Sequence, residues 1–142
     1  MAIQNVQVKN SRIGVHSGFE KPQVMQLVSI IIQYEEIDKI EKRIELGLRK
    51  RTRLSFFTET YFGIISAKDL ELYDEDGNLI NTILMPKGKV IALYNNWFIM
   101  QQNKSVYAYD KTGKVVADGI IPEDGNKSLV LNLIDDKERS EA

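Results

Sequence analysis

The spacing of hydrophobic positions changes along the chain and divides it into three zones. Near the start, Val6 and Val8 alternate with polar neighbours, which indicates a short strand. From Pro22 to about Leu46 the apolar positions recur every three or four residues, which is the period of an amphipathic helix. From Leu54 onward, short apolar runs are separated by turn residues, which is typical of β-strands.

The predicted helix over residues 22–46 has both a start and a stop. Pro22 suits the first turn, where its missing N–H is not needed, and Gly47 is placed to end the helix. The β-branched run Ile30–Ile32 favours a strand over that short stretch, but the three-and-four spacing is given more weight. That spacing joins one polar and six apolar positions: Leu27, Ile30, Tyr34, Ile37, Glu41, Ile44 and Leu48.

Two roles are open for this helix. Written as heptads, its apolar positions put leucine or tyrosine at a and isoleucine at d, which shifts coiled coils toward three or four strands. The flanking e and g positions carry no complementary charges, so packing on the chain's own sheet is the alternative.

Three consecutive segments have the pattern of β-hairpins, with two arms around a turn. With the flanking arms at residues 61–66 and 129–134, they predict an antiparallel meander of about eight strands. The Asp-Gly turn of the first is the strongest short-range hairpin signal in a sequence. The segments are Leu70–Asn81 around Asp76-Gly77, Val90–Met100 around Asn95-Asn96, and Val106–Ala117 around Thr112-Gly113.

The β region repeats itself at an offset of 36 residues. Six identities fall in the 26 positions from Tyr61 to Pro86, where average composition would give about one or two. We therefore predict two units of four short strands, at about residues 60–93 and 96–133. The identical pairs are Phe62 and Phe98, Lys68 and Lys104, Tyr73 and Tyr109, Asp74 and Asp110, Gly77 and Gly113, and Pro86 and Pro122.

Val106–Val116 (VYAYDKTGKVV), and less closely Leu70–Ile80, resemble the inner hairpin of β-propeller blades of the pyrroloquinoline-quinone-like and WD types. The resemblance covers about half of the chain. It implies blade-like units, and it carries neither a cofactor nor an enzymatic activity to this chain. A propeller ring needs four to eight blades, so two would close only by oligomerisation, and three chains would supply six.

The amino-acid composition restricts the classes of function that the chain can have. The chain has 142 residues, 43% of them hydrophobic and 27% charged, as in an ordinary globular protein. Its formal net charge of −1 supplies no general attraction to nucleic acid or lipid. Because cysteine is absent and His16 is the single histidine, thiolate chemistry is excluded and most acid–base schemes lose their usual proton carrier.

We therefore predict an α+β protein with three parts. Residues 1–53 hold the helix, residues 54–134 form the duplicated β domain, and residues 135–142 are a charged tail. No apolar run approaches the ~20 residues that cross a bilayer, so we expect a soluble, cytoplasmic protein with no membrane partner.

The segment Lys39–Arg53 is the sharpest charge feature, with seven cationic and two acidic residues. If Leu48–Phe57 is extended, its arginines fall on one side of a strand and present guanidinium forks to a phosphate or carboxylate. The alternative is structural: cations at the end of a helix complement the helix dipole, and arginines on an edge strand protect it from aggregation. The candidate phosphate- or nucleic-acid-binding residues are Arg49, Lys50, Arg51 and Arg53.

A group of aromatic residues is a candidate partner surface, because large amphipathic rings are enriched at binding hot spots. The alternative is that Trp97 and its aligned counterpart Tyr61 are equivalent core residues. Asp74–Asn78 lacks the spacing of a calcium loop, so no metal site is predicted there. The candidate partner-binding residues are Tyr94, Trp97, Tyr107 and Tyr109.

The function predicted from these patterns is a non-catalytic interaction or scaffold module without a cofactor. We expect it to form a homo-oligomer, a trimer if blades close a ring, and to bind a protein or glycan partner through its hairpin loops. The alternative is a small nucleic-acid- or phosphate-binding protein that uses the basic segment at residues 39–53.

Overall fold

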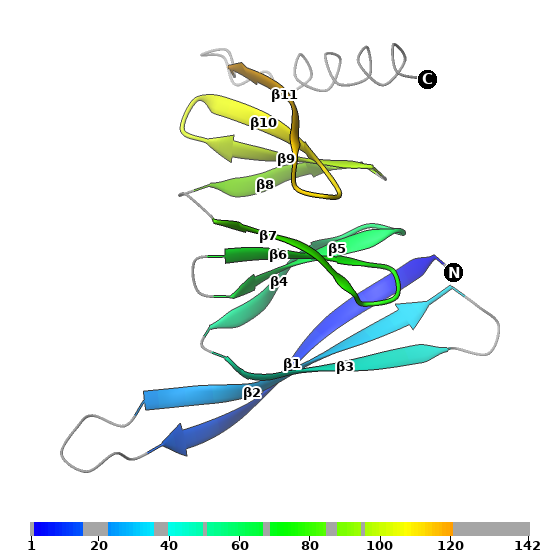
Figure 1. The fold of residues 1–142 in the computed structure, drawn as a ribbon, viewed down its shortest axis with the longest axis vertical. Coiled ribbons are helices and arrows are strands. Elements are labelled where there is room, and N and C mark those ends of the chain that lie inside the picture. Colours follow the sequence, from blue (N-terminus) through cyan, green and yellow to red (C-terminus); the bar gives the residue numbers. More distant parts are fainter. Residues whose placement is uncertain are drawn as a thin grey trace. The chain divides into compact units, whose positions relative to one another are not determined.

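The computed structural model describes residues 2–15, 23–35, 40–49, 51–66, 69–84, 88–94 and 96–120. These residues form eleven strands in three antiparallel sheets, and the chain divides into two compact units, Met1–Met85 and Pro86–Ala142 (Figure 1). The predicted arm at residues 129–134 and the predicted tail lie outside the described residues. The described part of the protein is therefore all-β.

The first unit begins with a three-stranded sheet in the order β1-β2-β3. Its long strands β1 and β2 run side by side (Figure 1). The strands are β1 (Ile3–Val15), β2 (Gln23–Tyr34) and β3 (Glu41–Arg49).

The α+β prediction is wrong, because the segment predicted as a helix forms strands β2 and β3. In β2 the apolar side chains of every second residue face the core: Val28, Ile30 and Ile32 are fully buried. On the opposite face Leu27 is 43% exposed, although the small Ser29 is buried there. This period of two turns the β-branched residues toward the core, which suits their stiff side chains. The coiled-coil hypothesis is wrong as well, because it required this helix. Leu27 and Tyr34, which were assigned to the same heptad position, differ in burial: Leu27 is exposed and Tyr34 is buried.

Gly47 interrupts a strand instead of ending a helix. Its φ of +79° lies in the left-handed region, and the register between β2 and β3 shifts where it faces Val28. A glycine in this conformation is the signature of a β-bulge that adds one residue to a strand. The same residue type thus serves a different local structure from the one predicted.

The first unit continues with a four-stranded meander, β4 (Thr52–Phe57), β5 (Tyr61–Ser66), β6 (Asp69–Asp74) and β7 (Leu79–Leu84), in spatial order β4-β5-β6-β7. One face of this sheet packs on β1–β3. Side chains of both sheets form one core cluster, in which Ile30 and Ile32 meet Phe62, Ile64 and Tyr73. Burial of this shared apolar surface holds the two sheets of the unit together.

The second unit holds a second meander, β8 (Lys89–Leu93), β9 (Trp97–Gln102), β10 (Ser105–Asp110) and β11 (Val115–Ile120), in order β11-β10-β9-β8. The described strands of residues 52–120 thus form two four-stranded sheets, the number of units and strands predicted from the repeat, but each sheet begins and ends one strand earlier than the predicted units at residues 60–93 and 96–133. Each sheet has the strand number of a propeller blade.

The 36-residue repeat corresponds to equivalent positions in these two sheets. The rings of Phe62 and Tyr73 stack at 5.2 Å with an interplanar angle of 9°, and those of Phe98 and Tyr109 stack at 5.2 Å with 11°. Each pair lies directly opposite across two antiparallel strands. The repeated residues therefore specify the same cross-strand packing twice.

The hairpin turns predicted at Gly77 and Gly113 are confirmed, each glycine having a φ of +84°. Oδ1 of Asp74 accepts the N–H groups of Asp76 and Asn78, each at 2.9 Å. Oδ1 of Asp110 does the same for the turn that contains Gly113. An aspartate that bonds the backbone of its own turn is the expected partner of a left-handed glycine.

The first of these loops is docked against the three-stranded sheet. The Tyr34 hydroxyl donates to the Glu75 carbonyl at 2.5 Å. A Cβ on Gly77 would overlap the side chain of Ile44. The hairpin tip therefore closes one end of the core between the two sheets.

Gly77→Ala should destabilise the protein more than Gly113→Ala. Both substitutions put a side chain at the same φ, at about 1–2 kcal/mol, but only the first must also displace Ile44, which adds about 1–3 kcal/mol. Urea unfolding followed by far-ultraviolet circular dichroism measures the difference. The fluorescence of Trp97 reports the second unit separately, and equal losses in the two variants would contradict the docking of the first loop.

Candidate functional site

A hollow with a volume of about 410 Å³ lies in the first unit where β1 and β2 approach β4 and β5. One hydrogen bond crosses it, from Asn10 Nδ2 to the Thr52 carbonyl at 3.4 Å. We call it the basic hollow. Its lining residues are Asn10, Gln26, Arg51, Thr52, Arg53 and Ile65.

Two exposed arginines give the hollow its charge. Arg53 lies on β4 directly opposite Ile65 of β5, so both side chains are on the same side of the sheet. Arg51 lies in the connection before β4 with a φ of +44°, which is uncommon for a residue with a side chain. Among the described residues, the ion pairs are Arg43–Glu45 and Arg49–Glu71, and neither involves these two.

Gln26 contributes an amide with unmet hydrogen-bonding capacity. Within the described part of the chain, its Oε1 is buried and has no hydrogen-bond partner. A buried polar atom in this state costs stability unless something bonds it. The hollow thus combines two cationic groups with a neutral polar wall.

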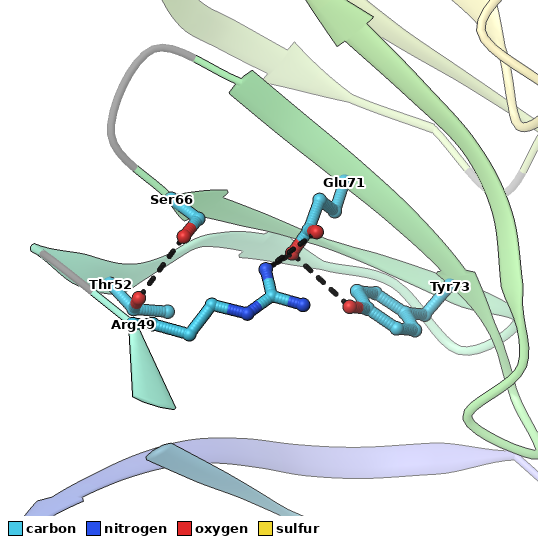
Figure 2. Close-up of polar contacts among 5 residues, drawn as sticks. All are labelled: Arg49, Thr52, Ser66, Glu71 and Tyr73. Carbon is cyan, nitrogen blue, oxygen red and sulfur yellow. Dashed lines mark hydrogen bonds and ion pairs between the residues drawn. The ribbon is translucent and has the colours of Figure 1, made fainter. Parts of the chain in front are cut away.

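Arg49, predicted to act together with Arg51 and Arg53, is engaged elsewhere. Its Nη1 donates to both carboxylate oxygens of Glu71, each at 2.6 Å, and the Tyr73 hydroxyl donates to Glu71 Oε1 at 3.2 Å (Figure 2). This group links β3 of the three-stranded sheet to β6 of the meander. Beside it, the Thr52 and Ser66 hydroxyls lie 3.2 Å apart (Figure 2).

Burial and charge set the protonation of this group. The hydrogen bond that Arg49 donates to Glu71 raises the pKa of Arg49 above its usual value, so the guanidinium stays charged. Burial, followed by the nearby Glu71 carboxylate, raises the pKa of Tyr73 to about 12. The tyrosine is therefore a neutral donor at physiological pH, and the group is an ion pair that joins two sheets.

The basic segment does not form one strand with its arginines on one side. β3 ends at Arg49, and β4 begins at Thr52 after the bend at Arg51. The structure brings Arg51 and Arg53 to one hollow and directs Arg49 to Glu71. Lys50 lies outside the described residues.

The four aromatic residues predicted as a partner surface do not share a face. Trp97 is 6% exposed and packs in a cluster that Tyr94 also contacts. Tyr107 and Tyr109 lie opposite Met100 and Phe98, on the other side of the sheet from Trp97. Their rings are 6.5 Å apart.

Reasoning from sequence missed four of the six lining residues: Asn10, Gln26, Thr52 and Ile65. Asn10 and Gln26 lie on β1 and β2, far from the basic segment in sequence, and no motif marks them. Only the approach of β1 to β4 in the folded chain brings them beside Arg51 and Arg53. Hydrophobic alternation identifies strands but does not predict which edges meet.

Among the described residues, no three side chains of the types that ligate metals lie close enough to hold an ion. The described part of the chain likewise contains no helix that is long and apolar enough to span a membrane. Comparison with protein-family models, curated proteins and solved structures gave no match.

Arg49→Met should lower the free energy of unfolding by about 2–4 kcal/mol, because it leaves the buried Glu71 carboxylate without its cation. The matched control is Arg43→Met, whose ion pair with Glu45 is more than half exposed and should cost at most about 0.5 kcal/mol. Urea unfolding measures both. Arg49→Met/Glu71→Leu should regain most of the loss, and a double variant as unstable as the single would contradict this account.

The unfolding free energy should fall as the pH rises from about 10 to about 12. The pKa of Tyr73 is about 12 in the folded protein, against about 10 in the unfolded chain, so between these values only the unfolded state releases the proton. Burial also raises the pKa values of Tyr34 and Tyr109, so the control is Tyr73→Phe, which should show a shallower decline. Urea midpoints at pH 9, 10 and 11 test this, and parallel curves would refute it.

Proposed function

We propose that the protein is a non-catalytic interaction module that self-associates through the outer edge of β7. The observation that carries the proposal is the make-up of this edge strand. Leu79 is 53% exposed and Leu84 is 78% exposed. Leucines exposed on an edge strand favour addition of another strand.

The other sheet edges carry charges that oppose such pairing. Every outer strand of the three sheets except β7 contains at least one charged residue, whereas β7 (LINTIL) has none. Charged residues on an edge strand discourage pairing with a second chain. The charged positions include Lys9 in β1, Arg43 in β3, Arg53 in β4, Lys89 in β8 and Asp118 in β11.

The occupant we propose for this edge is β7 of a second copy of the chain. Two identical strands that pair antiparallel are related by a two-fold axis perpendicular to the sheet, which is the symmetry of the commonest protein dimers. Pairing would join two four-stranded sheets into one of eight strands and cover both leucines. This arrangement replaces the trimer that was predicted partly from a coiled coil.

A second candidate function concerns the hairpin loops, which were predicted to contact a protein or glycan. The first loop is occupied, since Tyr34 and Ile44 of the three-stranded sheet hold it. In the second hairpin loop, between β10 and β11, the side chains of Lys111 and Lys114 are exposed. We therefore limit the proposed loop contact to the second hairpin, whose two lysines favour an acidic partner surface.

Leu84→Lys should convert a dimer into a monomer without loss of stability, because the substituted side chain is 78% exposed in the single chain. The matched control is Ile120→Lys at the equivalent position of β11, which is 74% exposed and should leave the dimer intact. Light scattering coupled to size exclusion at several concentrations measures the mass. A wild-type protein that stays monomeric at tens of micromolar, or equal effects of the two lysines, would exclude β7 pairing.

A further inference from the structure

The arginines of the first unit divide into two groups. Four have described side chains, and two of these, Arg43 and Arg49, bind carboxylates of their own chain. The other two, Arg51 and Arg53, line the basic hollow, where no carboxylate is among the lining residues. Like charges that share one concave site repel each other, and a bound anion relieves that repulsion.

We infer that the basic hollow binds a phosphoryl group, held by the guanidinium forks of Arg51 and Arg53. The volume of about 410 Å³ lies within the range of small-ligand sites and admits a phosphoryl group with part of the molecule that carries it. Ile65 supplies an apolar wall for that part, and Asn10 and Gln26 supply neutral polar contacts.

The number of arginines favours a phosphoryl group over a carboxylate. In this protein a single guanidinium neutralises a carboxylate, because Arg49 Nη1 reaches both oxygens of Glu71 at 2.6 Å and the other donor, the Tyr73 hydroxyl, is uncharged. Two forks in one hollow match an anion with three terminal oxygens and up to two negative charges. A terminal phosphoryl group has all three of these oxygens, whereas an internal phosphodiester of an oligonucleotide has two non-bridging oxygens and one negative charge.

The Gln26 amide is a second, independent feature. Its buried Oε1 has no hydrogen-bond partner among the described residues. Because this oxygen is buried, a ligand reaches the amide only when the side chain rotates, and rotation would offer its N–H groups to the anion. Since the oxygen has no partner to give up, that rotation breaks no hydrogen bond of the described residues.

The backbone at Arg51 is a third feature. At a φ of +44°, glycine is favoured over any residue with a Cβ. The backbone alone would therefore favour glycine at this position, where the chain has an arginine. A substitution can therefore separate binding from folding. Arg51→Gly removes the guanidinium and at the same time relieves the backbone.

The test is binding of inorganic pyrophosphate to the full chain at low salt, measured by isothermal titration calorimetry. We expect saturable binding that weakens about tenfold or more in Arg51→Gly and in Arg53→Ser, as for loss of a charged hydrogen bond. Arg43→Ser is the matched control, because it removes one arginine from the same unit outside the hollow, and it should change the affinity less than twofold. The melting temperature of Arg51→Gly should equal or exceed that of the wild type.

A parallel titration with a ten-nucleotide oligothymidylate, followed by fluorescence anisotropy, separates the two sources of phosphate. Tighter binding of the oligonucleotide, with a steeper salt dependence, assigns the site to nucleic acid, and comparable or tighter binding of pyrophosphate assigns it to small phosphorylated molecules. Absence of saturable binding of either probe would overturn the inference. So would an Arg43→Ser variant as weak as the two hollow variants, since binding would then follow overall charge only.

Discussion

The structure of the first unit depends on the packing of its three-stranded sheet against the inner face of the first meander. Ile30 and Ile32 from one sheet and Phe62, Ile64 and Tyr73 from the other are buried together, and this apolar contact is the main attraction between the sheets. The polar groups at its border follow from it. Arg49 meets Glu71, and Tyr34 meets the Glu75 carbonyl, because the packed sheets bring them within hydrogen-bonding distance. The basic hollow also exists only because β1 lies beside β4.

A comparison of the two meanders separates the residues that stabilise each repeat internally from those that contact other parts of the protein. Both keep the stacked phenylalanine–tyrosine pair and the aspartate–glycine turn, which stabilise a hairpin from within. They differ where the first meander contacts the additional sheet. Glu71, which binds Arg49, corresponds to Tyr107 in the second meander, and the docked loop residue Glu75 corresponds to the exposed Lys111. Internal contacts are thus duplicated, while outward contacts differ between the two units.

The proposed binding surfaces lie at the positions that this architecture leaves unsatisfied. An uncharged outer strand offers backbone groups and leucines, and the basic hollow offers cations that no described carboxylate neutralises. The two surfaces involve different residues and different forces. Pairing at β7 would rest on main-chain hydrogen bonds and apolar contact and would depend little on salt, whereas binding in the hollow would rest on charge and weaken as salt rises.

The sequence alone determined the local features: the turns at Gly77 and Gly113, the stacked pairs at an offset of 36 residues and the strand around Val6 and Val8. These depend on neighbours in the chain or directly across one hairpin. Reasoning from sequence assigned residues 23–34 and 41–46 wrongly to a helix, because apolar positions of two strands recur at helical spacing. These residues form strands because of sheet partners that are distant in sequence. The roles of the arginines were likewise decided by tertiary structure. Arg49 forms an ion pair with Glu71, whereas Arg51 and Arg53 line the hollow, although all three lie in one short segment. Their neighbours Glu71, Asn10 and Gln26 come close to them only when the sheets pack.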